Sequence, residues 1–328
     1  MKKLNVGIVG CGVISSVHIP LILKKHNLVA VCDIDQKKAK NIAIENSCSY
    51  YKDYSEMLKK EELDVVHILT PHNIRYDVIN EAIKNNTHII IEKPLAFTYE
   101  EAEKIMKLLD NNPNIEATVI YQNRRNESYL KLKNELPKSN IGKIIGIEGT
   151  VFWRRDLEYY KEGSWRGKLL ESGGGLLINQ AIHTLDWMQD IGGDICNING
   201  IISKLKNKSL EVEDTASINI EFSNGIVGFF SGTLCNAINS SVSLNIICEK
   251  GSYIIKNGSL YFYDKEKEIV LCSDAKGEIK DYYGASHEKE IYSFYNSLGN
   301  KEKTYFSIKE SMKSLKIVTD VYKKGMSI

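Results

Sequence analysis

The stretch LNVGIVGCGVIS, residues 4–15, decides the fold of the first part of this chain. Its first seven residues form a short apolar run with β-branched side chains, which predicts a buried strand. The run ends in a G-x-G-x-x-S turn that leads into a segment of helical spacing. Glycines let the backbone approach a pyrophosphate, and the start of the next helix supplies amide donors. We therefore expect Gly10, Gly12, Val13 and Ile14 to bind a dinucleotide.

Strands and helices alternate along the first third of the chain. Short apolar runs recur between segments of helical spacing, which predicts a parallel sheet covered on both faces. In such sheets ligands bind beyond the carboxyl ends of the strands, so the residues that follow each strand are candidate ligand contacts. The predicted strands are residues 4–10, 28–33, 63–71, 87–94 and 115–121.

An aspartate closes the second predicted strand. Asp33 lies 21 residues beyond Gly12, where an acidic side chain can accept hydrogen bonds from the adenosine ribose and repel a 2′-phosphate. The sequence therefore predicts NAD rather than NADP. The alternative is an aspartate that only caps a helix or closes a turn.

A lysine and a proline follow the fourth predicted strand in the tripeptide EKP, Glu92 to Pro94. Proline cannot continue the ladder, so the chain turns here and Lys93 is expected at the carboxyl edge of the sheet. A lysine there can polarise or protonate a substrate oxygen, although a lysine at a strand end is often only solvated. The loop TPHN, which begins at Thr70, follows the third strand at the same edge.

The segment GGGLLINQAIHTLDWM, residues 173–188, joins three glycines to a stripe of polar residues. Asn179, His183 and Asp186 are spaced four and three apart, so a helix would present them on one face. We expect this face to point toward an interdomain cleft, with the glycines passing close to the cofactor. The alternatives are a hydrogen-bonded core histidine and a supporting role for Asp186.

The alternation stops after Tyr121. Runs rich in Ile, Val and Phe follow with short polar breaks, and SNG at 223–225 and EKG at 249–251 are hairpin signals. We therefore predict an α/β chain with a doubly wound Rossmann domain, residues 1–121, and an α+β domain with a large, mostly antiparallel open sheet, residues 122–328. A broad sheet of this kind usually meets a partner sheet, which predicts a homodimer or homotetramer.

Composition excludes several classes of partner. The 328 residues are 43% hydrophobic and carry a formal charge of +1, so nothing favours nucleic acid or an anionic membrane. No segment reaches the roughly 18 apolar residues of a membrane span, and the apolar part of MKKLNVGIVGC is too short for a signal peptide. Seven scattered cysteines without a C-x-x-C pair argue against a disulfide framework and a metal site. The expected compartment is the cytoplasm.

The glycine turn, the aspartate after the second strand, the T-P-H loop, EKP and the later G-G-G…H-x-x-D pattern together resemble the Gfo/Idh/MocA family, the glucose–fructose oxidoreductase and inositol dehydrogenase group. The resemblance covers nearly the whole chain. It implies a dinucleotide-binding domain joined to an α+β domain with a large open sheet. EKP with the downstream histidine pattern is the specific part of the match.

The resemblance also implies the catalytic residues. The family's lysine, aspartate and histidine positions fall on Lys93, Asn179 and His183. This chain therefore has an amide where inositol dehydrogenases have a carboxylate, and an amide binds a hydroxyl but cannot ionise. Lys93 and His183 are the predicted catalytic residues, and Asn179 is predicted to bind substrate.

Further contacts are predicted from position. Trp165 and Arg166 in GSWRG resemble a W-R pair of the branch that oxidises sugars and nucleotide sugars, where the pair lies against the cofactor; the alternative is an exposed loop anchored by one tryptophan. Arg124 and His287 are predicted to bind substrate. The remaining predicted cofactor contacts are Thr70, Pro71, His72, Glu92, Lys93 and Gln122.

The other histidines have no place in that scheme. His67 and His88 fall inside predicted strands and are expected in the core. His26, at a helix end, is expected at the surface. His18, on the first helix, has no predicted role.

Together these features predict hydride transfer between NAD and a secondary alcohol or ketone of a sugar, inositol or nucleotide sugar. Two other classes remain open. One is a glycosidase that uses transient oxidation with tightly held NAD. The other is a sugar-sensing regulator that keeps the fold and has lost catalysis.

Overall fold

The computed structural model describes residues 3–138, 140–162, 164–206, 208–265, 267–275, 285–324 and 326–327. Their contacts divide the chain into two compact units. The first holds Met1–Tyr121 and His287–Ser311, and the second holds Gln122–Ser286 and Met312–Ile328. The start of GSWRG at residue 163, and residues 276–284 before His287, lie outside the described residues.

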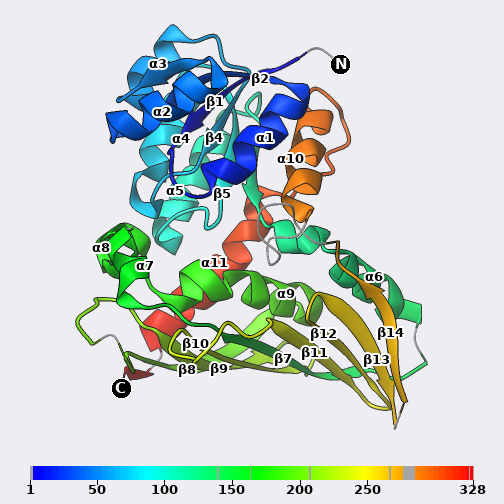
Figure 1. Ribbon diagram of the computed structural model, residues 1–328. Helices are drawn as coiled ribbons and strands as arrows, with labels where there is room; N and C mark the ends of the chain where they lie inside the picture. Colours follow the sequence, from blue (N-terminus) through cyan, green and yellow to red (C-terminus); the bar gives the residue numbers. More distant parts are fainter. Residues whose placement is uncertain are drawn as a thin grey trace. The chain divides into compact units, whose positions relative to one another are not determined.

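The first unit is built on a parallel sheet whose described strands run in the order β3-β2-β1-β4-β5-β6, with helices on both faces (Figure 1). β4 and β6 are buried throughout and β1 and β5 nearly so, because both faces of the sheet are covered. This is the predicted doubly wound Rossmann arrangement. The strands are β1 (Asn5–Val9), β2 (Asn27–Cys32), β3 (Ser49–Tyr51), β4 (Val65–Ile68), β5 (His88–Glu92) and β6 (Ala117–Ile120). The helices are α1 (Ser15–Lys25), α2 (Gln36–Asn46), α3 (Tyr54–Lys60), α4 (Arg75–Lys84), α5 (Tyr99–Asp110) and α10 (Ser286–Ser297).

One strand of this sheet is absent from the sequence prediction. The three residues of β3 pair in parallel with β2, with Ser49 opposite Ala30. Their side chains are polar or aromatic and exposed or half-buried. No apolar run marks such an edge strand, so periodicity does not reveal it.

A late segment completes the first unit. The hydroxyl of Tyr292 on α10 donates to a backbone carbonyl of α1, at 2.9 Å. On β6 the Thr118 hydroxyl donates to the carbonyl of Phe306, at 2.7 Å. The predicted second domain of residues 122–328 is therefore wrong in one part, because residues 287–311 pack with the first unit.

The second unit is built on a sheet of nine described strands in the order β14-β13-β12-β11-β7-β10-β9-β8-β15, and Figure 1 shows α9 along one face of it. Every neighbouring pair is antiparallel except β7 with β10 and β8 with β15. The predicted large, mostly antiparallel open sheet is confirmed. The strands are β7 (Ile144–Phe152), β8 (Ile195–Ser203), β9 (Thr215–Phe222), β10 (Val227–Thr233), β11 (Ser243–Cys248), β12 (Ser252–Lys256), β13 (Ser259–Asp264), β14 (Lys267–Ser273) and β15 (Met326–Ser327). The helices are α6 (Glu127–Glu135), α7 (Leu157–Glu162), α8 (Leu169–Ser172), α9 (Ile182–Gly192) and α11 (Ile308–Lys324).

Alternation in the sequence sets the faces of this sheet. Along β9 buried and non-buried residues alternate strictly, as expected for a strand with one covered face. The two predicted hairpins are present: SNG connects β9 to β10, and EKG connects β11 to β12. Gly225 of SNG has a φ of +85°, which favours glycine at the turn.

Candidate active site

The glycine turn after β1 is crowded at one glycine and open at the other. Gly10 has a φ of +105°, and a Cβ there would lie 2.7 Å from the carbonyl atoms of Leu69. A Cβ on Gly12 would have no heavy atom within 4 Å. The fold thus requires the first glycine, while the second leaves open space next to the start of α1. This space fits a diphosphate, and the contacts of Val13 and Ile14 with it remain predictions.

Asp33 follows β2 and holds the glycine turn. Its Oδ2 accepts a hydrogen bond from the N–H of Cys11 at 2.7 Å, and its Oδ1 accepts one from the N–H of Asp35 at 2.8 Å. A carboxylate offers about four acceptor positions. The turn-closing role is therefore present in the structure, and it is compatible with the predicted acceptance of ribose hydroxyls.

A buried arginine ties the loops after β4 and β5 together. The guanidinium of Arg75 donates to the backbone carbonyls of Thr70 (3.0 Å), Glu92 and Pro94. Burial lowers the pKa of Arg75 to about 10, against the opposing effect of the Glu92 carboxylate. Sequence reasoning missed this residue, because an arginine in an amphipathic helix is normally exposed and nothing in the pattern marks it as buried.

Lys93 is the first residue beyond β5, and it is half-buried. The Lys93–Pro94 peptide bond is cis, and the strand ends before the proline, as predicted. Gly12 follows β1, and Thr70 follows β4. Because the three strands are parallel neighbours, the structure brings the glycine turn, the TPHN loop and the EKP lysine to one edge of one sheet.

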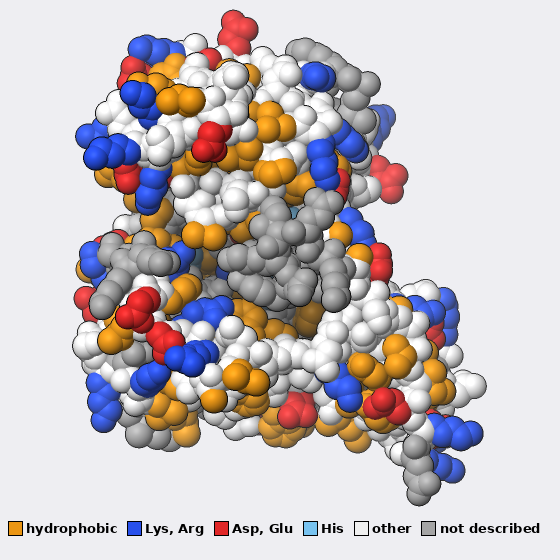
Figure 2. Space-filling view, viewed as in Figure 1, with side chains coloured by type: hydrophobic (Ala, Val, Ile, Leu, Met, Phe, Trp, Pro, Cys, Tyr) orange, Lys and Arg blue, Asp and Glu red, His pale blue; other side chains and the backbone are white. Residues whose placement is uncertain are grey.

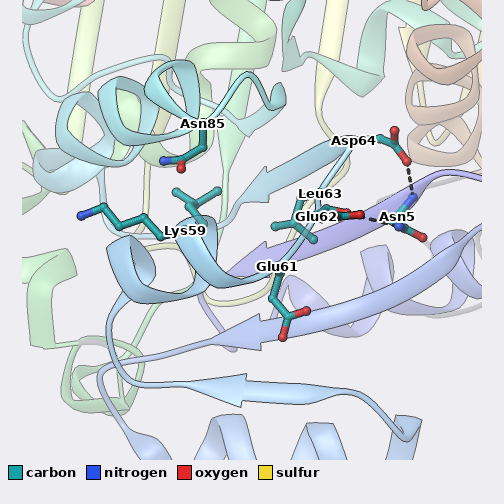
Figure 3. A pocket seen from close by; sticks show the side chains of 8 residues that line it. Asn5, Lys59, Glu61, Glu62, Leu63, Asp64 and Asn85 are labelled. Atoms are coloured by element: carbon teal, nitrogen blue, oxygen red, sulfur yellow. Dashed lines mark hydrogen bonds between the residues drawn. The ribbon is translucent and has the colours of Figure 1, made fainter.

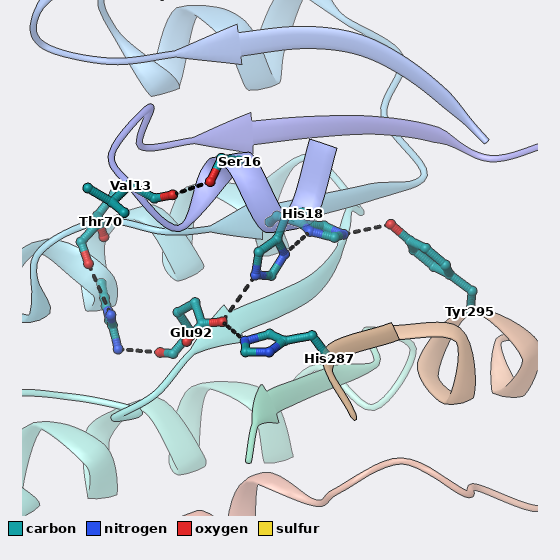
Figure 4. A network of polar contacts seen from close by, with 9 residues as sticks. Val13, Ser16, His18, Thr70, Glu92, His287 and Tyr295 are labelled. Atoms are coloured by element: carbon teal, nitrogen blue, oxygen red, sulfur yellow. Dashed lines mark hydrogen bonds and ion pairs between the residues drawn. The ribbon is translucent and has the colours of Figure 1, made fainter. Parts of the chain in front are cut away.

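Three histidines, a glutamate and a tyrosine form a buried polar cluster in the first unit (Figure 4). The Oε1 of Glu92 lies 3.0 Å from His18 Nε2 and 3.3 Å from His287 Nε2. His18 Nδ1 lies 2.8 Å from His67 Nδ1, and His67 Nε2 lies 2.6 Å from the hydroxyl of Tyr295. We call these five residues the histidine–glutamate network. His67 is in the core as predicted, whereas no role was predicted for His18.

Two further histidines of this unit, His26 and His88, each accept a hydrogen bond from a backbone N–H. His26 was expected at the surface, but only 7% of it is exposed, because its ring packs edge-on against Tyr295 and its Nδ1 accepts the N–H of Leu4. The surface prediction is wrong. His88, expected in the core, is half-buried at the start of β5 and accepts the N–H of Glu116 at 3.1 Å.

Two polar side chains interrupt a buried stretch of the second unit. Every residue from Gly174 to Gln189 is buried except Asn179 and His183, which are half-buried. Asn179 lies in a π-helical turn, η5 (Leu177–Ala181), and His183 lies in the first turn of α9. The predicted regular α-helix is therefore wrong at Asn179, because the turn that holds this residue is π-helical. π-Helical turns are rare and often occur at functional sites.

The glycine run before η5 packs against the second unit itself. A Cβ on Gly174 would collide with the ring of Tyr322, and one on Gly175 would collide with the carbonyl oxygen of Glu213. The buried Glu213 carboxylate accepts the N–H groups of Gly175 (2.8 Å) and Leu177 (2.9 Å) and the hydroxyl of Tyr322 (2.8 Å). Gly174 and Gly175 are thus required by close packing within the second unit, which differs from the expected approach to a cofactor.

Arg124, predicted to bind substrate, makes two ion pairs within the second unit. Its guanidinium donates to both carboxylate oxygens of Asp186, at 2.7 and 3.0 Å, and lies 2.7 Å from Asp190. Asp186 is 1% exposed, so the pair compensates a buried charge. Tyr129 and Lys133 also bind Asp190. Asp186 therefore supports the structure of α9, and a contact of Arg124 with substrate remains a prediction.

The other predicted contacts differ in exposure. The guanidinium of Arg166 lies 4.8 Å from the ring centre of Tyr159 and 5.1 Å from that of Trp165, so the Trp–Arg pair is a cation–π contact. Gln122 and His72 are buried, at 4% and 2% exposure. Contacts of these residues with a cofactor remain predictions.

A pocket of about 380 Å³ lies at the opposite edge of the first sheet (Figure 3). It is lined by Asn5, where β1 begins, and by Asp64, directly before β4. The Asp64 carboxylate accepts the N–H of Asn5 at 2.7 Å. Ligands of parallel sheets bind at the carboxyl ends of the strands, whereas this pocket lies at their amino ends.

Charged side chains of both signs are interspersed on the face shown in Figure 2, and no large patch of one sign is visible there. This distribution agrees with the formal charge of +1. Among the described residues, no helix is both long enough and apolar enough to span a bilayer.

Comparisons with known proteins agree with the fold. Residues 4–121 match the family model described as oxidoreductase family, NAD-binding Rossmann fold, and residues 129–254 match the GFO/IDH/MocA C-terminal domain. The chain is 24% identical to levoglucosan dehydrogenase of Pseudarthrobacter phenanthrenivorans, over 88% of this chain and 82% of that protein. It is 25% identical to scyllo-inositol 2-dehydrogenase (NAD(+)) of Bacillus subtilis, over 92% and 88%. The WlbA dehydrogenase of Chromobacterium violaceum, solved with NADH and UDP-GlcNAcA, superposes with a TM-score of 0.88 at 25% identity, over 99% of this chain and 94% of that one.

Proposed function

Because the chain belongs to the Gfo/Idh/MocA family of oxidoreductases with an NAD-binding Rossmann fold, we propose that it transfers a hydride between NAD and a secondary alcohol or ketone of a sugar, inositol or nucleotide sugar. The relatives above act on, or were solved with, compounds of these three kinds. The observation that carries the proposal is the placement of Lys93 at the same sheet edge as the open glycine turn.

The first unit has the features that NAD needs. The open space at Gly12 and the amides at the start of α1 would hold the diphosphate, and Asp33 would accept the ribose hydroxyls. When bound, NAD supplies the hydride acceptor at C4 of its nicotinamide. The further residues proposed to contact it are Val13, Ile14, Thr70, Pro71, His72, Gln122, Trp165 and Arg166.

The chain's own residues then orient the substrate and move its proton. His183 accepts the hydroxyl proton, while Lys93 donates a hydrogen bond to the same oxygen and stabilises its developing charge. Asn179 holds a neighbouring hydroxyl and does not titrate.

The test of this function is a substrate panel followed by a substitution. The protein is incubated with NAD and polyols, sugar acids and nucleotide sugars, and NADH is followed by its absorbance. With the substrate so found, we expect Lys93→Ala to lower kcat by roughly 100-fold or more, because a general acid–base group of this kind contributes about that much. Wild-type turnover by Lys93→Ala contradicts the assignment.

The same panel separates the other two classes. Tightly retained NAD with substrate cleavage and no net NADH would indicate a glycosidase that uses transient oxidation. Binding of a sugar without turnover anywhere in the panel would indicate a sugar-sensing regulator. Net NADH formation excludes both.

We also propose a homodimer or homotetramer. Non-buried positions alternate along β10, and Val227 and Phe229 are 37% and 48% exposed there. Apolar side chains on one face of a broad sheet favour a partner sheet. Size-exclusion chromatography with light scattering gives the mass in solution, and a mass of one chain, 37.2 kDa, contradicts the proposal. The proposed compartment is the cytoplasm, in keeping with seven free thiols.

A further inference from the structure

The hydrogen bonds of the histidine–glutamate network define where its protons lie (Figure 4). Oε1 of Glu92 accepts from Nε2 of both His18 and His287, so both rings carry a proton on that nitrogen. The 2.8 Å contact between the Nδ1 atoms of His18 and His67 needs one donor and one acceptor. If His67 donates there, its Nε2 accepts the hydroxyl proton of Tyr295. In this series of hydrogen bonds every donor then has an acceptor, with His18 and His67 neutral and Glu92 ionised.

The charges around Glu92 agree with this assignment. Burial alone would raise the pKa of Glu92, but the hydrogen bonds from His18 and His287 hold it well below its usual value. Burial lowers the pKa of His18, against the effect of Glu92, and lowers that of His67 well below its usual range. The groups that face Glu92 are His18 from α1, His287 from α10 and Arg75 from α4, which binds its backbone carbonyl.

These donors also have the chemistry of a metal site. The ligand atoms of His18, Glu92 and His287 lie within 4.8 Å of one another. Each of those atoms already takes part in a hydrogen bond of 3.0 or 3.3 Å. The network is therefore complete as a set of hydrogen bonds, and Glu92, the acceptor at its centre, directly precedes Lys93 in the chain.

We propose that Glu92 is a positioning residue for Lys93. His18 and His287 donate hydrogen bonds to its carboxylate, and Arg75 donates one to its backbone carbonyl. Side-chain and backbone bonds together therefore hold the end of β5, which Lys93 follows. The same carboxylate places a buried negative charge on the residue that directly precedes Lys93 in the chain. Glu92 and His287, at 6% and 2% exposure, then act through Lys93 rather than by the direct ligand contacts that the sequence predicts. This inference rests on the proposed role of Lys93.

The test compares wild type with Glu92→Gln, which keeps the oxygen acceptor and removes the charge. In protein without substrate, Lys93 is acetylated over a range of pH and its labelling is measured by mass spectrometry. We expect the labelling midpoint of Lys93 to move to lower pH in Glu92→Gln, because a neighbouring negative charge stabilises the ammonium. In turnover we expect kcat to fall roughly tenfold or more, with KM changed by less than about twofold.

His88→Gln is the matched control, because it alters an imidazole on the same strand at the opposite end. It should leave the labelling midpoint and kcat unchanged. His287→Gln, which keeps an N–H donor, should retain more activity than His287→Ala. This pair of variants replaces Glu92→Gln as the test if near-ultraviolet circular dichroism shows that Glu92→Gln is not folded. Wild-type labelling and kcat in folded Glu92→Gln would overturn the proposal. Failure of the proposed function looks different, since wild type would then turn over no substrate while the labelling still reports on Lys93.

Discussion

At position 179 the chain has an amide where its family resemblance implies an aspartate. The Nδ2 of Asn179 donates to the carbonyl of Gly174 at 3.1 Å, a bond that a carboxylate cannot make. The amide therefore ties η5 to the glycine run, and Asn179 itself is half-buried, four residues before His183. Position 179 therefore supplies no charge that could change the protonation of His183.

Replacing this amide tests that arrangement. In Asn179→Asp we expect the acid limb of the kcat/KM profile to move to higher pH, because a nearby carboxylate raises the pKa of an imidazole. His183 must be neutral to accept a proton, so a raised pKa removes activity at a higher pH than in wild type. The lost bond to Gly174 should also cost about 1 kcal/mol of stability. Asn199→Asp, an exposed position on β8, adds the same charge and should leave the profile in place.

At the scale of an element, α9 is held by charge as well as by packing. Asp186 and Asp190 on α9 both pair with Arg124, and Asp190 also pairs with the more exposed Lys133. Burial would raise the pKa of Asp190, but Arg124, Tyr129 and Lys133 lower it below its usual value. Arg124 therefore compensates the charges of two carboxylates on α9, the helix that carries His183.

The two cations should differ strongly in importance. Arg124→Met leaves Asp186 buried without its partner, and we expect a loss of about 3–5 kcal/mol in the free energy of unfolding. Lys133→Met, whose side chain is 43% exposed, should cost less than about 1 kcal/mol. Urea denaturation measures both, and adding Asp186→Asn to Arg124→Met should recover part of the loss. Equal costs for the two single variants would show that burial does not govern this network.

At the scale of the whole molecule, sequence and structure agree where residues near in the chain are also near in space. The order of strand and helix in residues 4–121, the two hairpins and the positions of Gly10, Asp33 and Lys93 all follow from local pattern and composition. The features that the sequence did not predict depend on contacts between different segments. Arg75 binds the backbone carbonyls of Thr70, Glu92 and Pro94. Glu213 accepts the N–H of Gly175, which lies 38 residues before it. The π-helical turn at Asn179 also escaped, since periodicity analysis assumes regular α-helical spacing.

Stability should depend on pH through the first unit. The pKa values of buried His18 and His67 are lowered, so the unfolded chain binds protons that the folded chain does not as pH falls below about 6.5. The free energy of unfolding should therefore decrease on acidification, by up to about 2.7 kcal/mol per pH unit for two protons. Glu92, ionised below its usual pKa when folded, adds a loss of the same sign below about pH 4.5. Urea denaturation between pH 7.5 and 5 measures the slope, and a flat profile contradicts neutral buried imidazoles.

The return of residues 287–311 to the first unit has a consequence for synthesis on the ribosome. A nascent chain that has emerged as far as Tyr121 already carries all the described strands of the first sheet. The carbonyl of Phe306, which accepts the hydroxyl of Thr118, is synthesised 188 residues after Thr118. The hydroxyl of Tyr295, which contacts His67, is synthesised 228 residues after His67. The domain that is translated first is thus completed only when residues 287–311 have emerged, and its open β6 edge needs protection until then.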